Sequence, residues 1–250
     1  MRTVIRVIVI GLLGGLVLAG CGTSRSSTAP TSTAAPSAAP PSAAAASAPA
    51  PTSASLPMLP ASGSVLAGTY TLDSALGITM DVPAGWETCC GGALVKNDFD
   101  GILYDRFTDG VTVYGDPCKW STGSSSQPKG AEAVASALAA QPGREASQPK
   151  GVTLGGLPAF HVRLVVPADQ KVTSVGSGNF EFDGCDQGEF RSFTDGSGDT
   201  RYHQAPTQTD DFYFVDVDGR TFVLDVVSGP EMAAAEKSAL DAMVASVRID

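Results

Sequence analysis

A long tract that cannot form a hydrophobic core determines which part of this chain can fold. From Gly22 to Ser62 the chain has 41 residues, and all but five of them are Ala, Pro, Ser or Thr. Such a tract cannot bury enough apolar surface to offset its chain entropy, and its prolines favour the extended polyproline II conformation. We therefore predict a disordered tether over residues 21–63, followed by one folded domain over residues 64–250.

The residues before the tether form an export signal. Arg2 and Arg6 precede an apolar run over residues 7–18, and a helix over 7–20 rises roughly 20 Å against a hydrocarbon core of about 30 Å. This pattern predicts a signal peptide over residues 1–20. The end of the run, Leu18-Ala19-Gly20-Cys21, resembles the bacterial lipobox, in which the cysteine thiolate receives a diacylglyceryl group.

This motif predicts a lipoprotein whose acyl chains on Cys21, palmitate among them, hold it to the extracytoplasmic face of the cell membrane. Two or three acyl chains suffice for stable attachment. The alternative is an ordinary secretory signal with a chance cysteine at this position.

The predicted domain is strongly acidic. It contains all 26 acidic residues of the chain and 13 of its 16 basic residues, which gives a formal charge of −13. We expect no nucleic-acid partner, because phosphate binding needs a basic face. A small ligand, a lipid or an envelope protein remain open as partners besides the membrane.

The clearest structural signal is a β-hairpin near the C-terminus. Two runs rich in aromatic and β-branched residues, 212–217 and 220–227, flank Asp218-Gly219, which is typical of a type I′ turn. One face, which we predict to be the core face, carries Tyr213, Val215, Phe222, Leu224 and Val226. The other face carries Phe212, Phe214, Val223, Asp216 and Asp225.

The remaining pattern predicts two helices and further strands. Ser228-Gly229-Pro230-Glu231 reads as a capping box that opens a C-terminal helix, and an Ala-rich helix runs over 130–140. Strands are expected over 69–72, 78–82, 93–96, 102–107, 111–114, 160–166 and 189–194. We therefore predict an α+β fold, with an antiparallel β-sheet flanked by two main helices after the tether.

Four cysteines remain after Cys21, namely Cys89, Cys90, Cys118 and Cys185. An even number in an exported domain favours disulfides, and four cysteines permit three connectivities. Cys89 and Cys90 either form a vicinal bond or reach different distant partners. A zinc site is the weaker alternative, because no C-x-x-C pair occurs.

Several motifs resemble a known family. These are Val82-Pro83-Ala84-Gly85-Trp86, Asp116-Pro117-Cys118-Lys119-Trp120, Cys185-Asp186-Gln187-Gly188-Glu189-Phe190 and the ending Val244-Ala245-Ser246-Val247-Arg248-Ile249. They resemble a family of uncharacterised actinobacterial domains, lipid-anchored or secreted, with paired D-P-C-x-W and C-D-x-G-E-F motifs. The general layout is also similar to PsbP-like domains. The resemblance implies that Cys118 and Cys185 form the family's disulfide and that Cys89 and Cys90 are additional. It implies no activity.

Candidate chemical residues are few. No G-x-S-x-G, G-x-G-x-x-G, P-loop or H-E-x-x-H motif occurs in the sequence. We predict that His161 faces solvent from a strand and that His203 lies in a loop, where Asp210 and Asp211 offer it a polar cluster. Asp195-Gly196-Ser197-Gly198-Asp199 alternates oxygen ligands like a calcium loop, but it lacks the glycine and glutamate at the required positions, so a glycine turn is the better interpretation.

The remaining candidates have structural interpretations. Asp216 and Asp225 could be paired carboxylates, but on a hairpin face we predict that they make the surface soluble. Trp86 and Trp120 could line a groove, but we predict that they close the edges of a core. We therefore expect no catalytic, cofactor-binding or metal-ligating residue.

These observations favour a non-enzymatic binding or interaction module of the cell envelope, held to the membrane through Cys21. The alternative is an envelope hydrolase that uses scattered carboxylates and the loop over residues 195–211. Several convergent carboxylates with raised pKa values in one cleft would favour the hydrolase, and an apolar groove would favour the binding module.

Overall fold

The computed structural model describes residues 55–89, 92–96, 100–107, 110–176 and 179–250. The chain divides after Pro51, and all of these residues belong to the second unit, Thr52–Asp250. The signal peptide, Cys21 and most of the predicted tether therefore lie outside the described residues. Within this unit Pro57 already bonds β2 (Gly68–Asp73), since its carbonyl accepts a hydrogen bond from the Thr71 amide at 2.8 Å.

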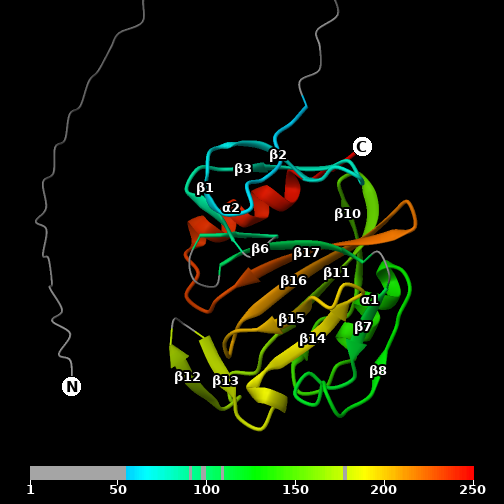
Figure 1. Cartoon of the computed structure of the whole chain (residues 1–250), viewed down its shortest axis with the longest axis vertical. Helices are drawn as coiled ribbons and strands as arrows, with labels where there is room; N and C mark the ends of the chain where they lie inside the picture. The colour runs from blue at the N-terminus through cyan, green and yellow to red at the C-terminus, as the bar shows by residue number, and fades with distance from the viewer. Residues whose placement is uncertain (1–54, 90–91, 97–99, 108–109, 177–178) are drawn as a thin grey trace, which may run out of the picture. The chain divides into compact units, whose positions relative to one another are not determined.

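A large antiparallel sheet forms the centre of the folded unit (Figure 1). In spatial order its strands are β1 (Gly63–Val65), β4 (Trp86–Cys89), β5 (Ala93–Val95), β6 (Gly101–Phe107), β17 (Arg220–Ser228), β16 (Thr209–Val217), β11 (Leu157–Val165) and β10 (Lys150–Leu154), while β9 (Glu145–Ala146) pairs with β11.

Three smaller sheets accompany it. One contains β18 (Arg248–Ile249), β3 (Ile78–Val82) and β2 (Gly68–Asp73), and another contains β15 (Thr200–His203), β14 (Phe190–Asp195), β7 (Val111–Tyr114) and β8 (Ser125–Ser126). The last is the pair β12 (Val172–Gly176) and β13 (Asn179–Phe182). The helices described are α1 (Ala131–Ala139), α2 (Ala234–Ala245) and the 3₁₀ turn Asp186–Gly188.

The predicted hairpin is confirmed. Val217 pairs with Arg220, so Asp218 and Gly219 are the two loop residues. Their φ angles are 49° and 76°, the positive values that a type I′ turn requires. This local signal places β16 and β17 side by side in the middle of the large sheet.

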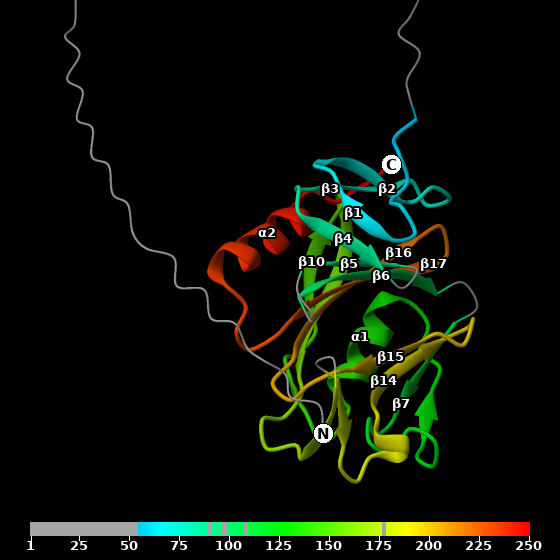
Figure 2. The same ribbon diagram turned by 60° about the vertical axis from the view of Figure 1, so that its left-hand side comes forward.

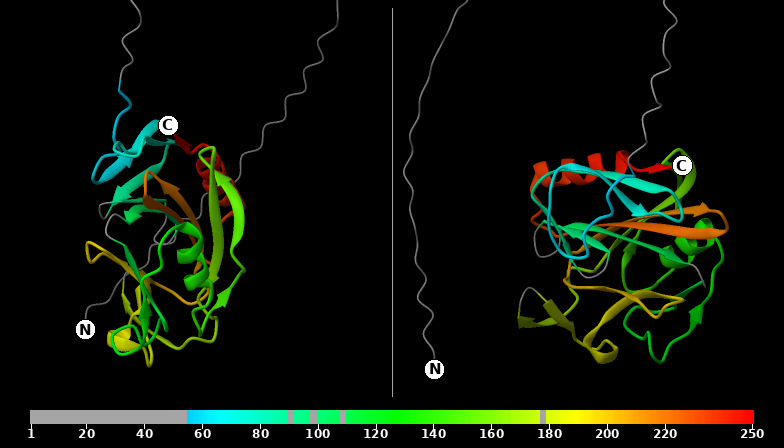
Figure 3. Two further views of the ribbon diagram at one scale, coloured as in Figure 1. Left: turned by 90° about the vertical axis from the view of Figure 1, so that its right-hand side faces the viewer. Right: turned by 45° about the horizontal axis from the view of Figure 1, so that its top comes forward.

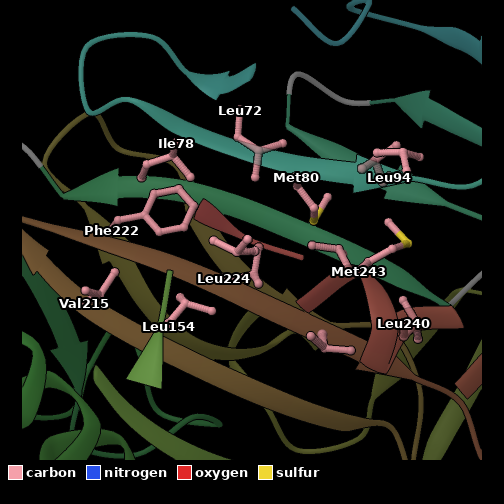
Figure 4. Close-up of a cluster of buried hydrophobic side chains, with 14 of the residues drawn as sticks. Leu72, Ile78, Met80, Leu94, Leu154, Val215, Phe222, Leu224, Leu240 and Met243 are labelled. Atoms are coloured by element: carbon pink, nitrogen blue, oxygen red, sulfur yellow. The ribbon is translucent and has the colours of Figure 1, made fainter. Parts of the chain in front are cut away.

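Both faces of this hairpin are buried, which the sequence analysis did not anticipate. The first core lies on the face that was predicted to be the core face, where β2, β3 and α2 cover the sheet; Figure 4 shows part of it, including Val215, Phe222, Leu224, Leu240 and Met243. The second core lies on the opposite face under α1, β7 and β14 and contains Phe212, Phe214, Val223, Val134 and Leu138. Figures 1 and 2 show α2 and α1 on opposite sides of β16 and β17.

The predicted fold class is wrong. The α+β expectation was one antiparallel sheet flanked by two helices, but the described part of the chain is mainly β-structure in several sheets. Both predicted helices exist, yet strands cover much of the large sheet. On one side these strands are β2 and β3, and on the other side they are β7 and β14; Figure 3 shows these layers from two further directions.

The predicted capping box does not start the C-terminal helix. Ser228 still belongs to β17, where it pairs with Thr209, and the Gly229 amide donates to the Asp100 carboxylate at 2.8 Å. The helix begins at Ala234 without a side-chain cap. The backbone of Ser228 is thus engaged in strand pairing and the Gly229 amide is bonded to Asp100, so the helix begins only at Ala234.

Candidate functional site

A buried charged network lies between the large sheet and the β14–β15 hairpin. Arg201, on β15, extends its guanidinium toward two strands of the large sheet. Its Nε donates to Asp225 Oδ2 on β17 at 2.6 Å, and its NH2 donates to Asp210 Oδ1 on β16. All three side chains are buried, with Asp210 at 0% exposed and Asp225 at 2%. Arg201 therefore links the two layers through charge-assisted hydrogen bonds.

His203 connects this network to a buried serine. Its Nδ1 lies 2.9 Å from Asp210 Oδ2, and its Nε2 lies 2.7 Å from Ser192 Oγ. Arg144 donates to Ser192 Oγ at 2.7 Å, so the hydroxyl is left to donate to His203 Nε2. These partners assign a neutral imidazole whose proton is on Nδ1 and points to Asp210.

This chain of Ser192, His203 and Asp210 has the connectivity of a hydrolytic triad, but it is not placed for catalysis. A nucleophile must reach a substrate carbonyl, whereas Ser192 and Asp210 are 0% exposed and His203 is 2% exposed. Ser192 Oγ is also engaged by Arg144. The three residues therefore act as an internal hydrogen-bond network that holds β14, β15 and β16 together.

Burial and neighbouring charges set the protonation states. Burial lowers the pKa of His203 to about 4, although Asp210 opposes this shift. Burial alone would raise the pKa of Asp210, but the charges of His203 and Arg201 hold it well below its usual range. Burial raises the pKa of Asp225 to about 8, and the nearby charge of Asp210 adds to the effect while Arg201 opposes it. At neutral pH, His203 is thus neutral and Asp225 carries a proton.

A cleft of about 630 Å³ opens next to this network. Its floor is one face of the large sheet and is mostly apolar, with Ala93, Val95, Gly101, Leu103, Val223, Asp225 and Val227. Its other wall is the β14–β15 hairpin, with Glu189, Arg191, Phe193, Asp199, Arg201 and Tyr202 among its residues. In Figure 1 this hairpin lies below β6 and β17. The volume is within the range of small-molecule sites, about 300–1,000 Å³.

A residue that lines this cleft has one polar atom without a partner. Asp225 Oδ1 is buried and has no hydrogen-bond partner among the residues that the structure describes, although Oδ2 of the same carboxyl is bound to Arg201. A buried polar group without a partner is costly, by about 1–3 kcal/mol. A ligand that bonded Oδ1 would remove this cost.

Cys118 and Cys185 form a disulfide, with Cα atoms 4.2 Å apart. This is the pairing that the resemblance implies, and it joins the two cysteine-containing motifs. Hydrogen bonds join them as well, because the Trp120 indole donates to the Asp186 carbonyl at 3.0 Å and Ser121 donates to the Asp186 carboxylate. The bonds from Ser121 hold the pKa of Asp186 below its usual range.

Cys89 ends β4 and contributes to the wall of the cleft. Cys90 lies outside the described residues, so the proposed second disulfide involving Cys89 and Cys90 stays a prediction. Lipidation of Cys21 stays a prediction for the same reason. In the described part of the chain, no helix is long and apolar enough to cross a membrane.

The two histidines differ from each other. His161 lies on the opposite strand face from Val162 and Leu164, as the alternation predicts; it is half-buried and bonds Asp211 at 2.7 Å. The prediction for His203 is wrong, because it is buried at the end of β15 rather than placed in a loop. It does join Asp210 in a polar cluster.

Of the two aspartates on the second hairpin face, Asp216 is exposed, as predicted, but Asp225 is not. Asp225 is buried, and Asp216 accepts hydrogen bonds from the Ala131 amide at 3.0 and 3.1 Å and from Thr221 at 2.6 Å. Asp216 therefore caps α1, and the two do not form a carboxylate pair.

Both tryptophans have structural contacts. Trp86 is 1% exposed and belongs to the first core. Trp120 is half-buried, and the Arg191 guanidinium lies 3.5 Å from its ring centroid. Neither residue lines the cleft.

The segment 195–199 forms the turn between β14 and β15. Asp195 Oδ1 accepts hydrogen bonds from the amides of Ser197 and Asp199, at 3.0 and 2.8 Å. Its oxygens thus fix the turn. No cluster of three His, Cys, Asp or Glu side chains suited to a metal occurs within the described ranges.

Sequence reasoning missed Arg201, Ser192 and Asp225 as members of one network. A signal was present in the run Phe222-Val223-Leu224-Asp225-Val226-Val227, which is apolar on both faces. Such a run is typical of a strand that is covered on both sides, and a carboxylate within it requires a buried partner.

Comparisons with known proteins do not identify a family. No protein-family model matches the chain, and no curated protein matches it in sequence. The solution structure of cyanobacterial PsbP (CyanoP) from Synechocystis is similar at 9% identity and a TM-score of 0.36, covering 73% of this chain and 92% of that one. The crystal structure of LpqN, involved in cell envelope biogenesis of Mycobacterium tuberculosis, is similar at 13% identity and a TM-score of 0.32, covering 73% and 84%. With identities and TM-scores this low, neither structure decides the fold family or the function.

Proposed function

We propose that this chain is a non-enzymatic binding module of the cell envelope, with its ligand site in the cleft between β5–β6–β17 and the β14–β15 hairpin. A lipid anchor on Cys21 would hold it to the extracytoplasmic face of the membrane, and the Ala/Pro/Ser/Thr-rich tether would give it a reach of roughly 35 Å as a coil. The sequence motif at residues 18–21 supports the anchor.

The observation that carries the proposal is the unpartnered Oδ1 of Asp225, a residue in the apolar floor of a cleft whose other wall is polar. Ligand sites of proteins combine apolar surface with placed polar groups, and this cleft has an aliphatic floor facing a polar wall. Three carboxylates line the cleft, but each is bonded to a neighbour: Glu189 to Arg191, Asp199 to Ser197 and Asp225 to Arg201. The other acidic residues near the network are engaged elsewhere. Asp195 holds a turn, Asp210 is saturated by Arg201 and His203, and Asp211 bonds His161 and Arg163.

The test is to identify what the protein carries. The full chain is purified from membranes in detergent, and bound molecules are identified by mass spectrometry. Leu103→Trp fills the cleft from its floor, and Val175→Trp places the same side chain on β12 at a residue that is 54% exposed and does not line the cleft.

We expect a ligand on the wild type and on the Val175→Trp protein but not on Leu103→Trp. Equal recovery from all three proteins would contradict a cleft site. Conversion of the recovered compound by the wild type but not by Asp225→Asn would replace the binding module with a hydrolase.

A further inference from the structure

We infer that the cleft binds an uncharged amphiphile, with an apolar body over the floor strands β5, β6 and β17 and an oxygen acceptor hydrogen-bonded to Asp225 Oδ1. This inference rests on the proposed function and names the class of its ligand.

The body of the ligand follows from the floor. The floor lines the cleft with aliphatic side chains, those of Ala93, Val95, Leu103, Val223 and Val227. A backbone glycine, Gly101, lies between them in the register, where it pairs with both Val95 and Val227. An apolar chain on this surface would gain about 25 cal/mol for each Å² removed from water.

The polar end of the ligand follows from the two oxygens of Asp225. Oδ2 already accepts from Arg201 Nε at 2.6 Å, whereas Oδ1 has no partner within the described ranges. Because burial raises the pKa of Asp225 to about 8, the carboxyl is protonated at neutral pH. Its proton belongs on Oδ1, since Oδ2 faces a donor. Oδ1 is then a hydrogen-bond donor that needs an oxygen acceptor, such as an ester carbonyl or a hydroxyl.

Charged ligands fit this position less well. A cation at Oδ1 would lie close to the Arg201 guanidinium, which is bound to the other oxygen of the same carboxyl. An anion would pass Glu189 and Asp199, which line the cleft. The arginines of the lining are already paired, Arg191 with Glu189 and Arg201 with Asp210 and Asp225. Both charges would also lose hydration against the apolar floor, which a neutral molecule avoids.

The experiment compares three probes that share a twelve-carbon chain and differ in the head group. They are 1-monolauroylglycerol, which is neutral, dodecylammonium, which is cationic, and laurate, which is anionic. The full chain is purified in detergent, and one-to-one adducts at pH 7 are titrated by native mass spectrometry. We expect monolauroylglycerol to bind at least about tenfold more tightly than either charged probe. A tenfold difference in affinity corresponds to the contribution of about one hydrogen bond to a buried group.

Variants of Asp225 test the contact itself. Asp225→Asn keeps a donor at this position, through its amide, so binding of monolauroylglycerol is retained. Asp225→Leu keeps the size but removes the donor, so binding weakens by about tenfold. Arg201 still has Asp210 as a partner in both variants, and circular dichroism verifies that they fold.

A second pair of variants is independent of the buried network. Leu103→Trp abolishes binding, and the matched Val175→Trp does not. Tighter binding of dodecylammonium or laurate, still blocked by Leu103→Trp, would overturn the ligand class but leave the cleft as a binding site. Binding that Leu103→Trp does not change, or no binding of any probe, would overturn the cleft site and this inference together.

Discussion

Asp225 makes the stability of the folded unit depend on pH in a direction opposite to that of most carboxylates. Its pKa is raised from 3.8 to about 8 by burial, so the folded state keeps a proton that the unfolded state has released. The stabilisation from this proton is complete below pH 3.8 and is lost as the pH rises through 8.

His203 acts in the opposite sense over a lower range. Burial lowers its pKa from 6.5 to about 4. Between pH 6.5 and 4, His203 is therefore protonated in the unfolded state and neutral in the folded state. The stability contribution of His203 is therefore lost as the pH falls from 6.5 to 4. Each group changes the free energy of unfolding by about 1.4 kcal/mol per pH unit within its window.

The sum of the two effects gives a specific profile. Between pH 4 and 6.5 the opposite slopes of Asp225 and His203 cancel, and the free energy of unfolding stays nearly constant. Between pH 6.5 and 8, Asp225 is the one of these two groups whose protonation differs between the folded and unfolded states. Its effect lowers the free energy of unfolding by about 2 kcal/mol over this range.

The decisive perturbation is Asp225→Asn, with His203→Gln as its matched partner. In Asp225→Asn the free energy of unfolding no longer falls above pH 6.5. Only the effect of His203 remains, so the free energy of unfolding increases by about 3 kcal/mol from pH 4 to 6.5. His203→Gln leaves only the Asp225 slope, so stability falls throughout from pH 4 to 8. The assay is urea unfolding of the full chain at constant ionic strength, followed by circular dichroism and tryptophan fluorescence.

A wild-type stability that stayed constant between pH 6.5 and 8 would refute this reasoning, because it would mean that Asp225 is already ionised in the folded state. Identical profiles for the two variants would refute it as well, since their slopes have opposite signs.

Further predictions concern the covalent structure and the cap of α1. Replacing Cys118 and Cys185 by Ser opens a loop with a sequence separation of 67 and lowers the free energy of unfolding by about 4 kcal/mol in the chain-entropy model, measured by urea unfolding; an unchanged midpoint would contradict this. Asp216→Ala leaves the Ala131 amide without its acceptor and costs about 1 kcal/mol, whereas Asp216→Asn keeps most of the cap. Cys21→Ala releases the protein from membranes or leaves an uncleaved precursor, and the intact mass of an unmodified native Cys21 peptide would exclude lipidation.

The elements that the sequence predicts well are those with local signals. Asp218-Gly219 determines a two-residue turn, and the alternation in its flanking runs determines the register of β16 and β17. The helix at Ala131–Ala139 has a breaker at each end, Gly130 before it and Pro142 after it. These signals act over a few residues, so they do not depend on the rest of the fold.

The arrangement of the sheets could not be predicted in this way. Alternation in β7 and β14 assigns one face of each strand to a core, but it does not tell which sheet provides the partner. Short strands such as β8, β15 and β18 have too few residues to show a period. A single sheet covered by helices and several sheets stacked on each other therefore give the same sequence pattern.

The site was misjudged because alternation identifies a strand face but not what covers it. Asp225 shares its face with Phe212, Phe214 and Val223, and the sequence analysis assigned this face to solvent. Apolar residues on both faces of β17 are better explained by two buried faces. In that setting a lone carboxyl group needs a buried hydrogen-bond partner, and Arg201 on a distant strand donates to it.

The same reasoning separates structural from functional polar groups in this interior. Asp210 has donors on both of its oxygens, from Arg201, Gln208 and His203, and the Ser192 hydroxyl is shared between Arg144 and His203. Groups satisfied in this way stabilise the contact between layers, and they offer nothing to an incoming molecule. Asp225 differs because only one of its oxygens has a partner among the described residues, and it lines an open cleft. If Asp225 served only as the acceptor for Arg201 Nε, its other oxygen would remain unpartnered beside the cleft at a cost of about 1–3 kcal/mol. A ligand oxygen in the cleft accounts for both features.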